Sequence, residues 1–113
     1  MVDIRRRPDG GLLGYARQRD LPWILSLVGI DYWYLPELAP PDDLLARYRE
    51  DRDWDAYVPE FTERVLRTPA GEAALRAIVE DPRVPALWCI EPTSERCHRR
   101  LVAERLPGPV CHL

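Results

Sequence analysis

Short apolar runs mark the strands that we predict in this chain of 113 residues. Residues 2–5 alternate apolar and polar side chains, which is typical of a strand with one buried face. Residues 32–35 are mostly aromatic, a composition that favours strands, and Pro36 ends them. The run at 84–90 is almost wholly apolar, as expected of a strand buried on both faces. A last short strand is predicted at 110–113.

Apolar residues repeated at four-residue spacing predict the helices between these strands. The first helix begins at Asp20, a good capping residue, and ends at Gly29. It is expected to bury two pairs of apolar side chains, Trp23 with Leu27 and Ile24 with Val28. The other helices are predicted at 42–50, at 57–67, from 68–69 onward and at 94–106.

The alternation of strands and helices predicts an α/β fold. We expect a single domain over residues 1–113, with a small, mostly parallel, Rossmann-like sheet of about four strands flanked by helices. Because the first strand begins at residue 2, the chain is expected to be an N-terminally shortened version of a larger fold. A sheet with so few strands exposes its edges, and formation of a homodimer would protect them.

Composition and charge narrow the class of protein. The chain is 46% hydrophobic and 31% charged, which is typical of a globular protein and not of a disordered one. No apolar run reaches the roughly 20 residues of a membrane-spanning helix, and the N-terminus lacks a signal-peptide pattern. We therefore expect a cytoplasmic protein without a membrane partner. The net charge of −3 gives no support to nucleic-acid binding, although all 16 basic residues are arginine, which suits phosphates and carboxylates.

The last quarter of the sequence holds all three cysteines, and an odd number without a secretion signal argues against a disulfide framework. Residues 89–100 lie where a buried strand leads into a helix, which is where open α/β sheets bind ligands. Cys89 and Glu91 are expected to project at the end of the strand. Cys97 is expected in the first or second turn of the helix, where the helix dipole favours a thiolate. Arg99 adds a cation nearby.

These residues predict an anion-friendly pocket that contains thiols. Cys89 or Cys97 would be the nucleophile, and Glu91 or His98 would carry the proton. The expected ligand is a small molecule that bears phosphate or carboxylate, or a nucleotide, and no cofactor is predicted. The structural interpretation is that both cysteines fill the core, because free cysteine is among the most buried residue types. Whether the protein is an enzyme stays open.

A zinc site is an alternative, because Cys89, Cys97 and His98, with Cys111 or His112, supply suitable donor atoms. Two features of the sequence argue against it. The cysteines lack the close spacing of zinc knuckles. Adjacent residues on a helix also project about 100° apart, which would separate Cys97 from His98. No metal ligand is therefore assigned.

A non-catalytic binding module is the other alternative. Arginines at 5–7 could contact phosphates while Trp33 and Tyr34 stack on bases, as in proteins that bind single-stranded nucleic acid. Such a module could instead bind a protein partner. If it binds nucleic acid, its affinity should fall steeply as the salt concentration rises, since phosphate contacts release counterions.

The motif Cys89-x-Glu91 followed by Cys97-His98-Arg99 resembles the hallmark of a bacterial family called domain of unknown function 488. Members usually open with a strand and helix that precede the counterpart of residues 2–5, and Met1 falls where this unit is expected to have ended already. Other stretches that resemble the family lie at 2–5, 29–38, 68–69 and 110–113.

The resemblance implies a Rossmann-like α/β sheet and carries no established reaction. It also implies that several polar and sulfur-bearing side chains gather near the ends of the strands and on the helix that follows the last buried one. These residues are Asp3, Arg5, Tyr34, Glu37, Cys89 and Glu91 at the strand ends, with Cys97, His98 and Arg99 on the helix.

Overall fold

The computed structural model of the protein describes residues 1–10 and 14–112. Three short parallel strands form its sheet in the order β2-β1-β3, with β1 (Val2–Asp3) between β2 (Trp33–Tyr34) and β3 (Leu87–Trp88). Val2 lies opposite the first residue of each neighbouring strand. The predicted α/β class with a parallel sheet is therefore confirmed. Because the strands run the same way, their carboxyl ends meet at one edge, and the segments after β1 and β3 leave the sheet side by side.

The sheet has fewer and shorter strands than the sequence predicts. Residues 110–112 are irregular and exposed, so the described residues form three strands and not about four, and Leu113 lies outside the described part. The strand expected at 84–90 is reduced to β3. Val84 is 94% exposed, and Pro85 has no N–H to donate to a neighbouring strand. Apolar character alone therefore overestimated this strand.

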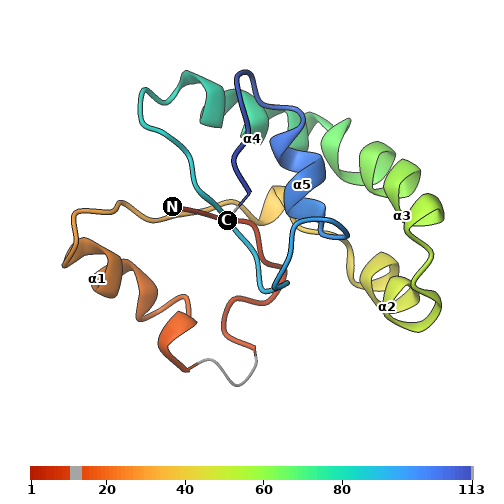
Figure 1. The fold of residues 1–113 in the computed structure, drawn as a ribbon, viewed down its shortest axis with the longest axis horizontal. Coiled ribbons are helices and arrows are strands. Elements are labelled where there is room, and N and C mark those ends of the chain that lie inside the picture. Colours follow the sequence, from red (N-terminus) through yellow and green to blue (C-terminus); the bar gives the residue numbers. More distant parts are fainter. Residues whose placement is uncertain (11–13, 113) are drawn as a thin grey trace.

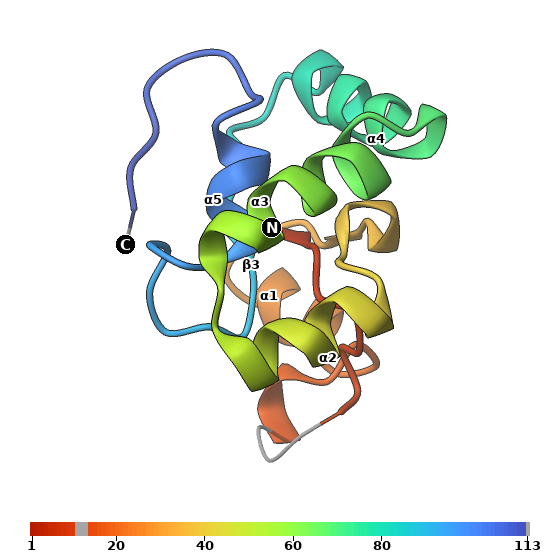
Figure 2. The same ribbon diagram turned by 90° about the vertical axis from the view of Figure 1, so that its right-hand side faces the viewer.

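Five α-helices surround the sheet in the described part of the chain. They are α1 (Leu21–Ser26), α2 (Asp42–Asp51), α3 (Trp54–Phe61), α4 (Pro69–Glu80) and α5 (His98–Ala103). A π-helical segment, Thr62–Leu66, extends α3, and 3-10 turns cover Gly14–Ala16 and Pro36–Leu38. In Figure 1, α1 lies on the left of the molecule and α2 and α3 on the right, and Figure 2 shows α2 and α3 in front of α1. None of the described helices combines the length and apolar character that crossing a membrane requires.

The first helix buries a different stripe from the expected one. Leu21 and Leu25 are its buried residues, whereas Trp23 is 66% exposed and Leu27 and Val28 are exposed as well. Leu21 and Leu25 also have four-residue spacing, so the periodicity predicted a helix correctly but could not say which side faces the core.

The hydrophobic core lies between β1 and the helices on the right of Figure 1. Its least exposed side chains come from five separate segments of the chain: Ile4, Leu38, Leu44, Phe61 and Val102. Phe61 belongs to α3 and Val102 to α5, so these two helices share the core that supports the end of β1.

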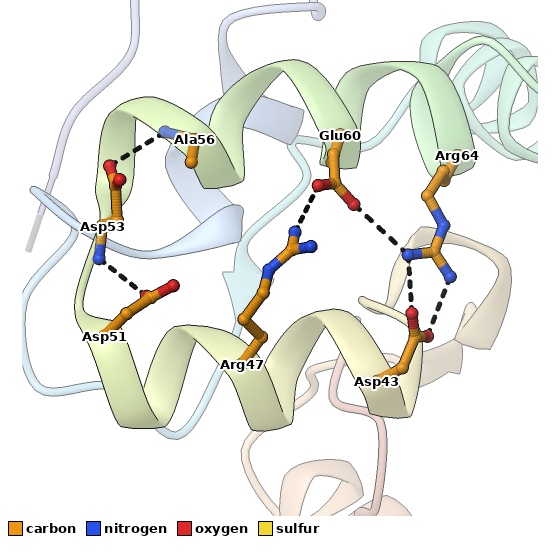
Figure 3. A network of polar contacts seen from close by, with 7 residues as sticks. All are labelled: Asp43, Arg47, Asp51, Asp53, Ala56, Glu60 and Arg64. Carbon is orange, nitrogen blue, oxygen red and sulfur yellow. Dashed lines mark hydrogen bonds and ion pairs between the residues drawn. The ribbon is translucent and has the colours of Figure 1, made fainter.

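Ion pairs hold α2 against α3 (Figure 3). Arg64 donates two hydrogen bonds of 2.8 Å to the carboxylate of Asp43, and Arg47 pairs with Glu60. Asp53 begins α3 by accepting a 3.0 Å hydrogen bond from the backbone N–H of Ala56. Exposed pairs of this kind are screened by solvent, so they add little to the stability of the fold.

The start of α4 agrees with the sequence. Thr68 caps the helix by accepting a 3.0 Å hydrogen bond from the backbone N–H of Gly71. A Cβ added at Gly71 would lie only 1.9 Å from the carbonyl oxygen of Val65. The close approach of these two backbones therefore requires glycine at this position.

We expect Gly71→Ala to lower the free energy of unfolding by about 1–3 kcal/mol, because the methyl group would force the backbones apart. Denaturation with urea, followed by circular dichroism, measures this change. Gly14→Ala is the matched control, since a Cβ there meets nothing within 4 Å. Equal effects of the two substitutions would contradict the close approach.

Candidate functional site

Two cysteines and a histidine meet at the carboxyl end of β3. The Nδ1 atom of His98 lies 3.8 Å from the Sγ of Cys89 and 4.0 Å from the Sγ of Cys97. All three donor atoms lie within 4.8 Å of one another, and both cysteines are free thiols. The three residues, which we call the Cys2His cluster, are only 2–8% exposed. The structure thus brings together three of the predicted site residues in the interior of the protein.

Local backbone geometry explains how the adjacent Cys97 and His98 converge. Cys97 is the N-cap of α5 and has an extended backbone, with φ −125° and ψ 138°, so it is not part of the helix. Its Sγ accepts a hydrogen bond of 3.4 Å from the backbone N–H of Arg99, the role that serine or aspartate usually has at an N-cap. The prediction that Cys97 lies within the helix was wrong, because the helix begins at residue 98 and not near 94. The argument against a shared metal ion fails with it.

A second hydrogen bond fixes the imidazole ring of His98. Its Nε2 lies 3.0 Å from the carbonyl oxygen of Ile4, the residue that follows β1. A carbonyl oxygen only accepts, so Nε2 carries the hydrogen. Nδ1, the other ring nitrogen, faces the two sulfur atoms. Phe61 packs against the ring, with centroids 5.7 Å apart.

The two thiols shift each other's pKa in opposite directions. The neighbouring Cys97 thiol lowers the pKa of Cys89 despite its burial, and His98 lowers it further. The neighbouring Cys89 thiol, together with burial, raises the pKa of Cys97. Cys89 is therefore the more acidic of the two thiols.

A small cavity adjoins the cluster on the side of α2 and α3. Its volume is about 20 Å³, and its walls include Cys97, His98, Glu91, Trp54 and Tyr57. This space is enough for one water molecule and far too small for a nucleotide. Burial raises the pKa of Tyr57, and the nearby cysteines raise it further, so its hydroxyl stays protonated at neutral pH.

A larger hollow of about 570 Å³ lies at the other end of the sheet. Its walls include Val2 and Trp33, the first residues of β1 and β2, and residues 84–85 just before β3. It therefore opens at the amino ends of the strands, away from the Cys2His cluster. None of the predicted catalytic or ligand-binding residues lines it.

Asp3 and Arg5 come together, as the resemblance implies, but they bind each other. Arg5 donates from Nε and Nη2 to the two oxygens of Asp3, at 2.9 and 2.7 Å, and both side chains are buried. The hydroxyl of Tyr32 donates a third hydrogen bond of 2.7 Å to Asp3. Tyr32 was not among the predicted residues, because its contact with Asp3 joins positions 29 residues apart. The guanidinium of Arg5 is thus engaged within the protein.

The other predicted residues lie around these two groups. Arg99 is half-buried and donates a hydrogen bond of 3.3 Å to the backbone carbonyl of Glu91. Tyr34 is half-buried and Glu37 is exposed, and neither lines the small cavity. Cys111 and His112 are exposed on the C-terminal segment and are not part of the cluster.

The arginines considered for nucleic acid have carboxylate partners. Arg6 and Arg7 both approach Asp42, at 3.4 and 3.3 Å, on the exposed surface. Trp33 and Tyr34 form β2 and are half-buried, so their rings are only partly available for stacking.

Comparison with known proteins gives one match. The model of the family described as "Domain of unknown function DUF488" matches residues 1–106. No curated protein and no solved structure matches the chain.

Proposed function

The chain belongs to the DUF488 family, a domain of unknown function, and we propose that this member binds a zinc ion through Cys89, Cys97 and His98. The placement of the His98 Nδ1 atom, 3.8 and 4.0 Å from the two sulfurs, is the observation that carries this proposal. In tetrahedral zinc sites the Zn–S distance is about 2.3 Å and the Zn–N distance about 2.0–2.1 Å, which separates sulfur from nitrogen by about 3.6 Å. The two nitrogen–sulfur distances would need to shorten by only a few tenths of an ångström. The two sulfur atoms, which lie within 4.8 Å of each other, would need to approach to about 3.8 Å, the separation of two zinc-bound sulfurs.

The surroundings of His98 support the same function. Histidine ligands almost always donate their second ring N–H to a carbonyl or carboxylate, which orients the ring and increases its basicity. The hydrogen bond from Nε2 to the carbonyl of Ile4 provides this support. A backbone N–H, that of Arg99, likewise contacts the Sγ of Cys97. Each of these two ligands thus has a partner that holds it in place before the ion binds.

The charge and chemistry of the donors favour zinc over harder cations. Thiolate and imidazole ligands select zinc and other soft or borderline metals, whereas magnesium and calcium require oxygen ligands. Two thiolates would also balance the charge of Zn²⁺, and burial of a site without net charge avoids the large penalty of an uncompensated ion.

Elemental analysis of the full chain, purified without chelator and dialysed against limiting zinc, tests the proposal. We expect one zinc per chain in the wild type and near-complete loss in Cys97→Ser and His98→Ala. Cys97→Ser is a clean variant because serine is itself a good N-cap, so α5 keeps its cap while the metal loses a thiolate. Cys111→Ser is the control, since Cys111 is exposed and outside the cluster. Wild type without zinc, or a Cys97→Ser protein with full zinc, would overturn the proposal.

A reactive thiol is the second candidate. The lowered pKa of Cys89 favours it, with His98 or Glu91 as the proton carrier. Its substrate would be a small molecule bearing phosphate or carboxylate, and the nearby cations are Arg96, which lines the cavity, and Arg99. The cavity of about 20 Å³ limits such a substrate to a group the size of one water molecule at the thiols. For this reason we place it after zinc.

A further inference from the structure

The zinc site proposed above has three protein ligands. Cys89, Cys97 and His98 are the only residues of their kind that the described part of the chain gathers closely enough to share an ion. Structural zinc sites almost always have four protein ligands, whereas catalytic sites have three and leave the fourth position to water or substrate. The small cavity beside Cys97 and His98 lies where a fourth ligand could enter.

Tyr57 provides a second, independent observation. The residue is only 3% exposed and lines the small cavity. Its hydroxyl forms no hydrogen bond with any described residue and is not one of the sealed polar atoms, so it stays open to a water molecule. The ring is held firmly, because it stacks on Trp54 at 5.2 Å and on Phe61 at 5.7 Å. The hydroxyl group is therefore fixed beside the cavity and free to bond to a molecule in it.

We propose that the fourth ligand of the zinc ion is an exchangeable water molecule in this cavity, held by a hydrogen bond from Tyr57. This inference rests on the proposed zinc site and goes beyond it, because it makes the centre a Lewis acid and not a structural clamp. A cavity of about 20 Å³ accommodates one water molecule. The ligand that replaces the water in a reaction would be a single donor atom of a small molecule, such as the oxygen of a carbonyl or phosphoryl group.

The aromatic wall suits this role. Tyr48 and Trp54 pack against Tyr57 and form one side of the cavity, which shields that side of the ion from bulk water. Electrostatic interactions are stronger where bulk water is excluded, and a polarised ligand would therefore respond more strongly to the metal and to the Tyr57 hydroxyl. Tyr57 would be a positioning residue for that ligand.

Cobalt substitution tests the inference, with azide as the probe. Co²⁺ bound to the full chain absorbs visible light in bands that depend on its ligands, and azide replaces only an exchangeable ligand. We expect the wild type to bind one Co²⁺ and its bands to change saturably with azide. Tyr57→Phe should bind Co²⁺ as well as the wild type does but bind azide about 5–10-fold more weakly, the effect of one lost hydrogen bond. Tyr34→Phe is the control, since Tyr34 does not line the cavity, and should match the wild type.

The possible results are distinguishable. Absence of Co²⁺ binding would overturn the zinc site itself. Stoichiometric Co²⁺ with bands that neither azide nor the smaller fluoride ion alters would leave the zinc site intact and overturn the open position. Altered bands in Glu91→Gln without azide would instead identify the Glu91 carboxylate as the fourth ligand, which also overturns it. If Tyr57→Phe does not fold, the azide response of the wild type still decides the open position. Equal azide affinity in a folded Tyr57→Phe protein would overturn the role of Tyr57.

Discussion

Zinc at 1,000 times its dissociation constant is expected to raise the free energy of unfolding of the wild type by about 4 kcal/mol. The reason is linkage. The folded chain holds the donor atoms of Cys89, Cys97 and His98 together and orients His98 through Ile4, so it binds zinc more tightly than the unfolded chain does. At roughly 4 °C per kcal/mol for a chain of this size, the melting temperature should rise by more than 10 °C. Calorimetry with and without zinc measures the rise.

The dependence of this stabilisation on each ligand provides the control. Cys97→Ser retains a capping side chain, so its stability without zinc should remain close to that of the wild type while the response to zinc largely disappears. Cys111→Ser should respond as the wild type does, because Cys111 is exposed and remote from the cluster. An undiminished rise in melting temperature for Cys97→Ser would mean that zinc stabilises the protein from some other place.

Asp3→Asn is expected to lower the free energy of unfolding by about 3–5 kcal/mol, because it leaves the charge of Arg5 buried without its partner. The side chains of Asp3 and Arg5 are 0% and 6% exposed. A loss of this size is a large part of the 5–15 kcal/mol that usually separates folded from unfolded protein. Urea denaturation measures it, and much of the variant could unfold at modest urea concentrations.

Two further variants separate the buried charge from the loss of a hydrogen bond. Asp42→Asn, which removes the exposed partner of Arg6 and Arg7, should change stability by no more than about 1 kcal/mol. Asp3→Asn combined with Arg5→Met should recover part of the loss, since removing both charges leaves no unpaired ion in the interior. If Asp3→Asn proves as mild as Asp42→Asn, the pair is not sealed from water.

Local features of the fold could be predicted from the sequence because their causes are local. The cap at Thr68 and the proline after it specify where α4 begins. The helix α2 begins at the acidic pair 42–43, as predicted, and ends one residue beyond its predicted end. The side of α1 that faces the core could not be predicted. Leu21/Leu25 and Ile24/Val28 have the same spacing, and only contacts with distant segments decide between them.

In the candidate site, too, local features could be predicted and contacts between distant residues could not. The sequence identified Cys89, Cys97 and His98 from their position between a strand and a helix. It misjudged their relation, because the separation of about 100° between neighbours applies only inside a helix and Cys97 lies just before one. The contact of His98 with Ile4 joins residues 94 positions apart, so no local pattern could indicate it.

Residues 3–5 contribute to the buried ion pair and also to the Cys2His cluster. Asp3 and Arg5 make the buried ion pair, and the backbone carbonyl of Ile4, between them, orients His98. Three consecutive residues thus connect the ion pair with the cluster. Loss of either group would disturb the strand that supports the other, so the energetic effects of changes at the two groups should be cooperative and not additive.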